Sequence, residues 1–172
     1  MEMKTERLSL KRLSEDDRDA MKELMTNETV KKTFMIPDAC NDEALEKMFA
    51  ALKRQSNSDE HYFRGIYLNN ALIGFINDVE IKDKSIEIGW AVHPKHHNHG
   101  YATEAAGRVV EDLFERGYTK VIAGAFIENP ASFKVMEKLG MKPNGFSENI
   151  DYHGSLHRCD YYEITKKAEG HR

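Results

Sequence analysis

The chain lacks a long hydrophobic run and has few cysteines. Its longest nearly continuous apolar stretch, residues 121–127, is seven residues long, whereas a membrane span needs ~20. The first residues alternate charged and apolar side chains and show no apolar signal-peptide core. Cys40 and Cys159 lie far apart and form no CxxC pair, which is typical of a reducing compartment. We therefore expect a cytoplasmic protein with no membrane partner.

The chain also lacks an excess of basic charge. It has 25 Lys and Arg against 29 Asp and Glu, a formal net charge of −4 with histidine counted as neutral. Proteins that bind nucleic acid usually carry a basic excess, so we expect no nucleic-acid partner. The net charge also depends on the eight histidines, because a histidine side chain gains or loses its charge near neutral pH.

The length of 172 residues fits one domain, on the prior of ~150 residues per domain. No fixed-period repeat and no linker-like segment interrupts the chain. We expect a single domain over residues 1–172, with a frayed basic end at 166–172.

Hydrophobic periodicity predicts an α/β (α+β) fold with a mixed, mostly antiparallel sheet flanked by helices. Helices are expected over residues 14–25, 41–55, 100–117 and 129–140. Strands are expected over residues 7–13, 61–68, 71–81, 85–92, 120–127, 145–150 and 157–165. Residues 31–38 are interpreted as a connection that ends at Pro37, and Asn69-Asn70 as a hairpin turn.

The most informative segment is a strand that ends at Val92, followed by a loop and a helix that begins at Gly100. A helix N-terminus exposes unpaired N–H groups and the positive end of the helix dipole, so it favours a phosphate. Gly100 has no Cβ, which lets a ligand approach the backbone closely. Many strand-to-helix turns contain glycine, so the turn by itself is a weak indication of phosphate binding.

The turn His97-Asn98-His99-Gly100-Tyr101-Ala102 resembles the Gln/Arg-x-x-Gly-x-Gly/Ala motif of the GNAT superfamily of acyl-coenzyme A-dependent N-acetyltransferases. Both small residues match, whereas His97 replaces the glutamine or arginine. The following Thr103-Glu104-Ala105 completes a GYATEA run common in the family. A second segment, Asn129-Pro130-Ala131-Ser132 and then Glu137-Lys138-Leu139-Gly140-Met141, resembles the family's Asn-x-x-Ser…Glu-Lys-x-Gly-Phe. The resemblance extends over residues 7–165 and is closest to the branch that includes the ribosomal-protein N-terminal acetyltransferases.

The resemblance implies the GNAT fold, acetyl-CoA as co-substrate and no metal. Coenzyme A should place its pyrophosphate on the loop N–H groups and its pantetheine arm against the strand end, where Asn129 contacts the arm. The N–H groups of Ala91 and Val92 should also polarise the thioester carbonyl. The implied cofactor-binding residues are Ala91, Val92, His97, Asn98, His99, Gly100, Tyr101, Ala102, Thr103 and Asn129.

The implied reaction is acetyl transfer to a primary amine by direct attack on the thioester. An alkylamine is mostly protonated at pH 7, since a lysine amine has a pKa of ~10.4, so a base must remove a proton directly or through water. Glu87 lies on the strand that family members use for this purpose, and Glu80 on the preceding strand is the alternative. Glu87 also alternates with Ile86 and Ile88, a pattern that equally fits a solvated carboxylate on a strand face.

The position at which many GNAT enzymes carry a tyrosine acid is Met136, which cannot donate a proton. The branch resembled here often has a serine at the position of Ser132, so Ser132 is expected to donate to the departing thiolate. A serine in the first turn of a helix also commonly bonds only to the backbone. Met136 and His97 leave a second interpretation open, a catalytically degenerate coenzyme A-binding or regulatory module.

Four histidines lie within seven residues, at His93, His96, His97 and His99. No carboxylate or cysteine stands beside them at metal-ligand spacing. Relatives carry arginine or lysine at several of these positions, so the cluster is interpreted either as conditional charge for the phosphates or as ordinary loop composition. The first interpretation predicts tighter coenzyme A binding below the ordinary histidine pKa of ~6.5.

The acceptor, a small-molecule or peptide amine, is expected on the opposite side of the cleft, between residues 31–38 and the late strands around 149–160. Glu148, Asp151 and Asp160 are placed to attract a cationic amine there, although exposed loop acids usually only interact with solvent. A protein N-terminus, a polyamine, an amino acid and an antibiotic all remain candidates. No sequence feature distinguishes a monomer from a homodimer.

Overall fold

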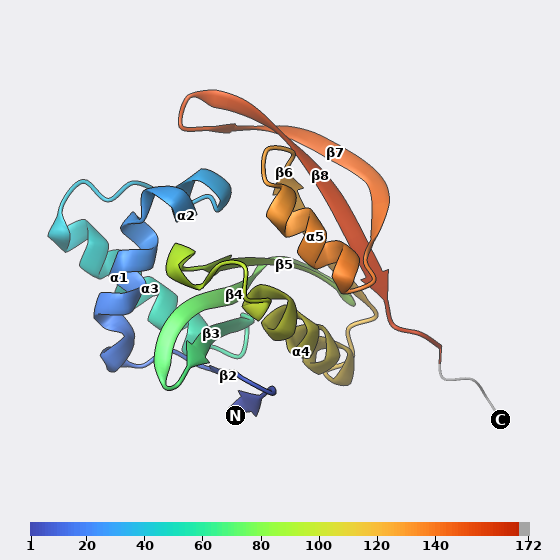
Figure 1. The fold of residues 1–172 in the computed structure, drawn as a ribbon, viewed down its shortest axis with the longest axis horizontal. Helices are drawn as coiled ribbons and strands as arrows, with labels where there is room; N and C mark the ends of the chain where they lie inside the picture. Colours follow the sequence, from blue (N-terminus) through green and yellow to red (C-terminus); the bar gives the residue numbers. More distant parts are fainter. Residues whose placement is uncertain (169–172) are drawn as a thin grey trace.

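The computed structural model describes residues 1–168, which form one mixed sheet with helices on both faces (Figure 1). Within these residues the strands are β1 (Met3–Lys4), β2 (Ser9–Lys11), β3 (Phe63–Leu68), β4 (Ala71–Lys82), β5 (Ser85–Val92), β6 (Lys120–Phe126), β7 (Lys142–Tyr152) and β8 (Ser155–Thr165). The helices are α1 (Arg18–Thr26), α2 (Glu28–Thr33), α3 (Asp42–Asn57), α4 (Tyr101–Glu115) and α5 (Pro130–Lys138). The predicted α/β class is confirmed.

The strands follow the order β1-β2-β3-β4-β5-β6-β8-β7 across the sheet. Every neighbouring pair is antiparallel except β5 and β6, which confirms the mixed, mostly antiparallel sheet. The parallel pair joins only Ser85–Glu87 to Lys120–Ile122. Beyond these residues the two strands diverge (Figure 1). The sheet is therefore split at the carboxyl end of β5, next to the segment that resembles a cofactor site.

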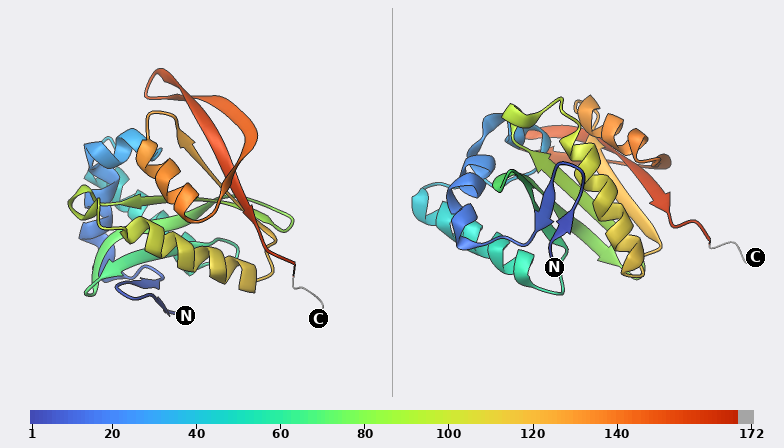
Figure 2. Two further views of the ribbon diagram at one scale, coloured as in Figure 1. Left: turned by 45° about the vertical axis from the view of Figure 1, so that its right-hand side comes forward. Right: turned by 60° about the horizontal axis from the view of Figure 1, so that its bottom comes forward.

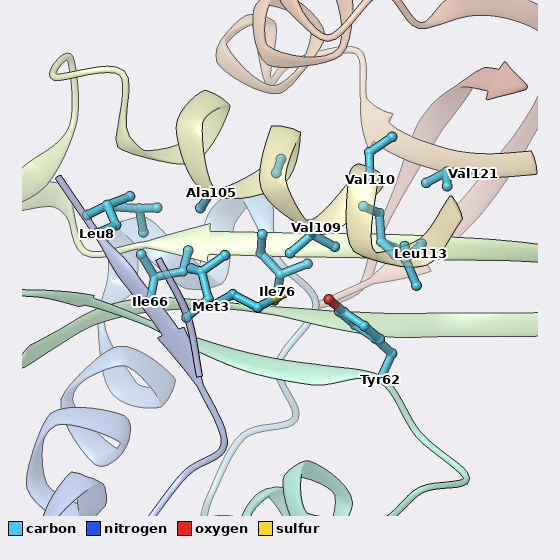
Figure 3. Close-up of a cluster of buried hydrophobic side chains, with 14 of the residues drawn as sticks. Met3, Leu8, Tyr62, Ile66, Ile76, Ala105, Val109, Val110, Leu113 and Val121 are labelled. Carbon is cyan, nitrogen blue, oxygen red and sulfur yellow. The ribbon is translucent and has the colours of Figure 1, made fainter. Parts of the chain in front are cut away.

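The two faces of the sheet carry different helices (Figure 2). Ile86 and Ile88 of β5 pack in the core beneath α4, whereas Ala91 packs in the cluster formed with α1, α2 and α3. Because side chains alternate along a strand, Glu87 lies on the same face as Ala91 and away from α4. The N-terminal segment also contributes to the α4 core, where Leu8 lies near α4 (Figure 3).

The structure differs from the predicted elements mainly near the N-terminus. Residues 31–38, predicted to be a connection, begin inside α2, whose N-cap Asn27 accepts hydrogen bonds from the N–H groups of Thr29 and Val30. The strand predicted over 7–13 shortens to β2, and β1 precedes it without a predicted counterpart. Both strands of the last hairpin are longer than predicted. β1 has two residues and α2 has six, which is too short for a strand or a helix to show its periodicity.

Lys166, the first residue of the predicted frayed end, is held in place: its N–H donates to the Thr119 carbonyl at 2.8 Å and its Nζ donates to the Phe114 carbonyl at 3.0 Å. Of the predicted frayed end, residues 169–172 lie outside the described part of the chain. Among residues 1–168, no helix combines the length and the apolar character needed to cross a bilayer.

Candidate active site

A cleft of about 230 Å³ opens at the end of β5, between the first turn of α4 and the helix α5. Its walls therefore bring together the two sequence segments that resemble the GNAT motifs. The predicted residues that line it are Ala91, Val92, His97, Asn98, Gly100, Tyr101, Ala102, Thr103, Asn129 and Ser132. Two predicted site residues, His99 and Glu87, are not part of this lining.

The loop before α4 has the geometry of an anion site. Gly100 is the N-cap of α4 and adopts the left-handed conformation, with φ 78° and ψ 9°, which glycine tolerates best. The N–H groups of Tyr101, Ala102 and Thr103 begin the helix, so they have no acceptor within it. All of these residues line the cleft. The loop therefore fits a pyrophosphate, for which a helix N-terminus is favourable.

The end of β5 has the geometry expected for an extended ligand arm. β5 pairs with β6 only as far as Glu87, so in the described residues its next part, 88–92, has no strand partner on that side. Such a free strand edge can pair with the amide groups of an extended ligand. The Nε2 atom of His97 lies 2.7 Å from the Val92 carbonyl, to which it donates. His97 therefore ties the loop to the strand end.

Two of the four histidines make structural hydrogen bonds outside the cleft lining. The Nδ1 atom of His93 accepts from the Lys95 N–H at 3.2 Å, and its Nε2 lies 2.7 Å from a carboxylate oxygen of Glu23. The Nδ1 atom of His99 donates to the His97 carbonyl at 2.7 Å. Of the four histidines, His96 and His97 are therefore the candidates for the predicted contact with the phosphates.

His96 and His97 line the cleft. Burial lowers the pKa of His96, and the neighbouring His93, His99 and Lys95 lower it further. The pKa of His96 thus lies below the ordinary histidine value. The pH dependence of coenzyme A binding stays a prediction. Within residues 1–168, no group of three His, Cys, Asp or Glu side chains is arranged to hold a metal ion.

Glu87 lies half-buried in a second cavity of about 270 Å³. Burial, followed by the charges of Glu80 and Glu148, raises the pKa of Glu87 to about 7. Glu80 is the cross-strand partner of Glu87 and is exposed. The structure thus gives Glu87, rather than Glu80, the protected environment typical of a general base.

Glu148 belongs to the same face of the sheet as Glu87. The Tyr161 hydroxyl donates to the Glu148 carboxylate. The Tyr161 ring lies against Gly124, where an added Cβ would come within 2.5 Å of ring atom Cε1. Of the other predicted acids, Asp160 accepts from the Arg158 Nε at 2.8 Å and Asp151 is exposed. Of the predicted acids around residues 148–160, Glu148 is the one whose charge acts on Glu87.

Phe34 covers β5 between the two cavities. A Cβ at Gly89 would lie 3.1 Å from Cε2 of Phe34, and Gly89 stands midway between Glu87 and Ala91. The Phe34 ring also packs edge-on against Phe75, with centroids 5.1 Å apart. The segment predicted to form the acceptor side therefore lies directly on the face that carries Glu87.

The last hairpin is attached to this same segment. The Tyr152 hydroxyl donates to the Lys31 carbonyl at 2.6 Å and accepts from the Ile36 N–H at 3.4 Å. The structure thus brings together residues 31–38 and the late strands, as the sequence predicts for the acceptor side.

Ser132 and Asn129 are linked at the start of α5. The Asn129 Oδ1 accepts from the Ser132 N–H at 3.4 Å, and the Asn129 Nδ2 donates to Ser132 Oγ at 2.9 Å. Because the Oγ atom accepts this bond, its own proton is available to donate into the cleft. Met136 is fully buried in the cluster between α5 and β6, so it contributes packing there.

Comparisons with known proteins decide the family. Residues 7–142 match the family model described as an acetyltransferase (GNAT) domain. The chain belongs to the GNAT acetyltransferase family. The family resemblance drawn from the sequence is confirmed, and the chain is an acetyltransferase that uses acetyl-CoA as donor.

Individual relatives agree with this assignment over nearly the whole chain. The uncharacterized N-acetyltransferase YnaD of Bacillus subtilis (strain 168) is 31% identical over 172 residues, covering 98% of this chain and 99% of the relative. A GNAT-family acetyltransferase from Bacillus anthracis superimposes with a TM-score of 0.81 at 26% identity, covering 96% and 98% of the two chains. RimL, a ribosomal alpha-N-protein acetyltransferase solved with coenzyme A, gives a TM-score of 0.81 at 16% identity, with coverage of 96% and 98%.

Besides His96 and the residues predicted from the sequence, seven residues of this acetyltransferase line the cleft: Val30, Thr33, Trp90, Ala131, Lys134, Val135 and Lys138. Val30 and Thr33 come from α2, which the sequence did not reveal. Lys134 and Lys138 come from α5, and their spacing of four residues places them on one helix face. That spacing was the signal in the sequence for two cationic side chains in this cleft.

Proposed function

We propose that this acetyltransferase moves the acetyl group of acetyl-CoA to a primary amine by direct attack, with Glu87 as the general base. The observation that carries the proposal is the placement of Glu87. It is half-buried, its pKa is raised to about 7, and it shares a face of β5 with Ala91 of the cofactor cleft. A base whose pKa lies near the working pH combines the deprotonated form with useful basicity.

Acetyl-CoA supplies the acetyl group as an activated thioester. The loop from His97 to Thr103 binds the pyrophosphate, and the unpaired edge of β5 binds the pantetheine arm. The His93 N–H donates to the Ile73 carbonyl on the β4 side, so by alternation the Val92 N–H faces the open edge. The Val92 N–H polarises the thioester carbonyl there. Ser132 donates its hydroxyl proton toward the departing sulfur.

The proton of the amine reaches Glu87 through water. Glu87 and Ala91 are four residues apart on an extended strand, a separation of ~13 Å at about 3.3 Å per residue. A glutamate side chain does not span that distance. The gap that remains is also longer than one water molecule can bridge. A chain of waters therefore carries the proton along this face to the cavity beside Glu87, which has room for water.

The acceptor amine approaches on the Glu87 side of the sheet, between residues 31–38 and the last hairpin. Glu80, Glu87 and Glu148 give this side negative charge, which favours a cationic primary amine. A small-molecule amine and a peptide N-terminus share that chemistry. The similarity to RimL, whose name describes an alpha-N-protein acetyltransferase, supports including peptides among the candidates.

The proposal is tested by incubating the protein with acetyl-CoA and a panel of amines. The panel contains polyamines, amino acids, aminoglycosides and short peptides with free N-termini, and the same peptides with blocked N-termini are the control. Thiol release is measured together with the mass of each amine. We expect at least one amine to accelerate thiol release above hydrolysis and to gain one acetyl group. Coenzyme A binding without amine-dependent release from any member would favour the degenerate binding module.

A further inference from the structure

Arg7 lies beside the phosphate-binding loop although it is more than ninety residues away in sequence. The N-terminal strands β1 and β2 run next to α4 (Figure 2). Met3 and Leu8 flank this segment and are buried in the same core as Ala105 of α4. The backbone around Arg7 is therefore held against the start of the helix by packing on both sides.

Glu104, in the first turn of α4, connects the helix to this N-terminal segment. Its Oε1 accepts from the Thr5 hydroxyl at 2.6 Å and from the Arg7 N–H at 2.8 Å. Its Oε2 accepts from the Arg7 Nε at 2.7 Å. Partial burial raises the pKa of Glu104, but the hydrogen bonds from Thr5 and Arg7 outweigh it and leave the pKa below its ordinary value. Glu104 is thus charged at neutral pH and makes three bonds to one segment.

The same guanidinium contacts the loop itself. The Arg7 Nη1 donates to the His99 carbonyl at 2.9 Å. The guanidinium carbon lies 4.7 Å from the centroid of the Tyr101 ring, on which the His99 ring stacks with centroids 5.4 Å apart. Arg7 therefore holds residues on both sides of Gly100.

The bond to His99 also orients the next N–H group. In a trans peptide the C=O and the following N–H point in opposite directions. Arg7 holds the His99 carbonyl on its own side, so the Gly100 N–H points away from Arg7. Gly100 lines the cofactor cleft and Arg7 does not. The N–H group is therefore turned to the side where an anion binds.

We propose that Arg7 is a positioning residue that holds the loop 97–103 in the shape that binds the phosphates of coenzyme A. It acts through Glu104, the His99 carbonyl and the Tyr101 ring, without touching the cofactor. The inference rests on the proposed placement of the pyrophosphate on this loop. Lysine does not replace arginine in this role, because one ammonium group cannot reproduce the planar fork that reaches Glu104 and His99 together.

Calorimetric titration with coenzyme A tests the proposal without any acceptor amine, so its outcome is separate from that of the amine panel. Arg7→Gln and Arg7→Lys should each weaken binding about tenfold, a typical factor for losing a hydrogen bond to a charged group. Arg12→Gln is the matched control. Arg12 has a similar exposure, 35% against 43%, and pairs with Asp59 away from the loop. The control should bind coenzyme A like the wild type.

A second readout separates loop positioning from general damage. S-acetylpantetheine keeps the thioester and the arm but has no phosphate. With an amine that the wild type acetylates, Arg7→Gln should raise the KM for acetyl-CoA and leave kcat/KM for S-acetylpantetheine unchanged. Equal losses with both donors, or wild-type affinity for coenzyme A, would overturn the proposal. If Arg7→Gln does not fold, Glu104→Gln decides, because it keeps the side-chain volume and should weaken coenzyme A binding in the same way.

Discussion

Gly100 and Gly117 stand at the two ends of α4, and both adopt a positive φ, 78° and 99°. Only Gly100 lines the cofactor cleft, whereas a Cβ added at Gly117 would meet nothing within 4 Å. The two glycines share a conformational requirement and differ in their distance from the cofactor. They therefore form a matched pair of sites for substitution.

Replacing either glycine by alanine should lower the free energy of unfolding by ~1–2 kcal/mol, because an L side chain is strained in the left-handed region. Only Gly100→Ala should also weaken coenzyme A binding, since its methyl group would lie 3.4 Å from Arg7 Nη2 and the strained backbone would alter the loop. Thermal denaturation and calorimetric titration measure the two effects. Equal coenzyme A affinities in Gly100→Ala and Gly117→Ala would place the phosphates elsewhere.

Ser132→Ala removes the proposed donor to the departing sulfur. The kcat for amine acetylation should fall by ~10²-fold, the lower end of the range for general acid–base catalysis, while the KM for acetyl-CoA changes little. Ser132→Thr keeps a hydroxyl and should recover part of the rate. Steady-state kinetics with saturating acetyl-CoA provide the measurement, and an unchanged kcat in Ser132→Ala would assign the serine to the helix cap alone.

Tyr152→Phe removes the hydroxyl that joins the last hairpin to residues 31–36. The free energy of unfolding should fall by about 1 kcal/mol, the usual net value of one hydrogen bond. The KM for the acceptor amine should rise, because the hairpin β7–β8 is no longer held at a fixed distance from residues 31–36. The KM for acetyl-CoA should stay constant. Tyr162→Phe is the control, since that ring packs against Phe133 on the α5 face. A larger change in the KM for acetyl-CoA than for the amine would contradict this assignment.

Local signals explain what the sequence predicted well. β5 begins and ends where the alternation of Ile86, Ile88 and their neighbours indicates, and the Asn69-Asn70 turn has the positive φ that its residues favour. The loop and helix after β5 follow from Gly100 and the apolar face of α4. Each of these features depends on residues within a short window.

The remaining features depend on contacts between distant segments. α2 has six residues and one buried side chain, Val30, which is too little for a periodic signal. Arg7 acts on His99 and Glu104 across more than ninety residues. Burial raises the pKa of Glu87 most, followed by Glu80 and then by Glu148, which only the sheet order brings near. The sequence therefore identified the candidate loop before α4, whereas the protonation state of Glu87 depends on contacts that it does not show.

The central claim is that Glu87 accepts the proton of an attacking amine, and the pH dependence of kcat tests it most directly. Glu87 acts as a base only when deprotonated, and its pKa is raised to about 7. The wild-type kcat should therefore fall as the pH decreases through about 7 and reach a plateau above it.

Glu87→Gln should lower kcat by ~10²–10⁴-fold and abolish this inflection. Glu80→Gln should keep the activity and move the inflection to lower pH, because Glu80 helps to raise the pKa of Glu87. A Glu87→Gln enzyme with full activity and an unchanged pH profile would contradict the account.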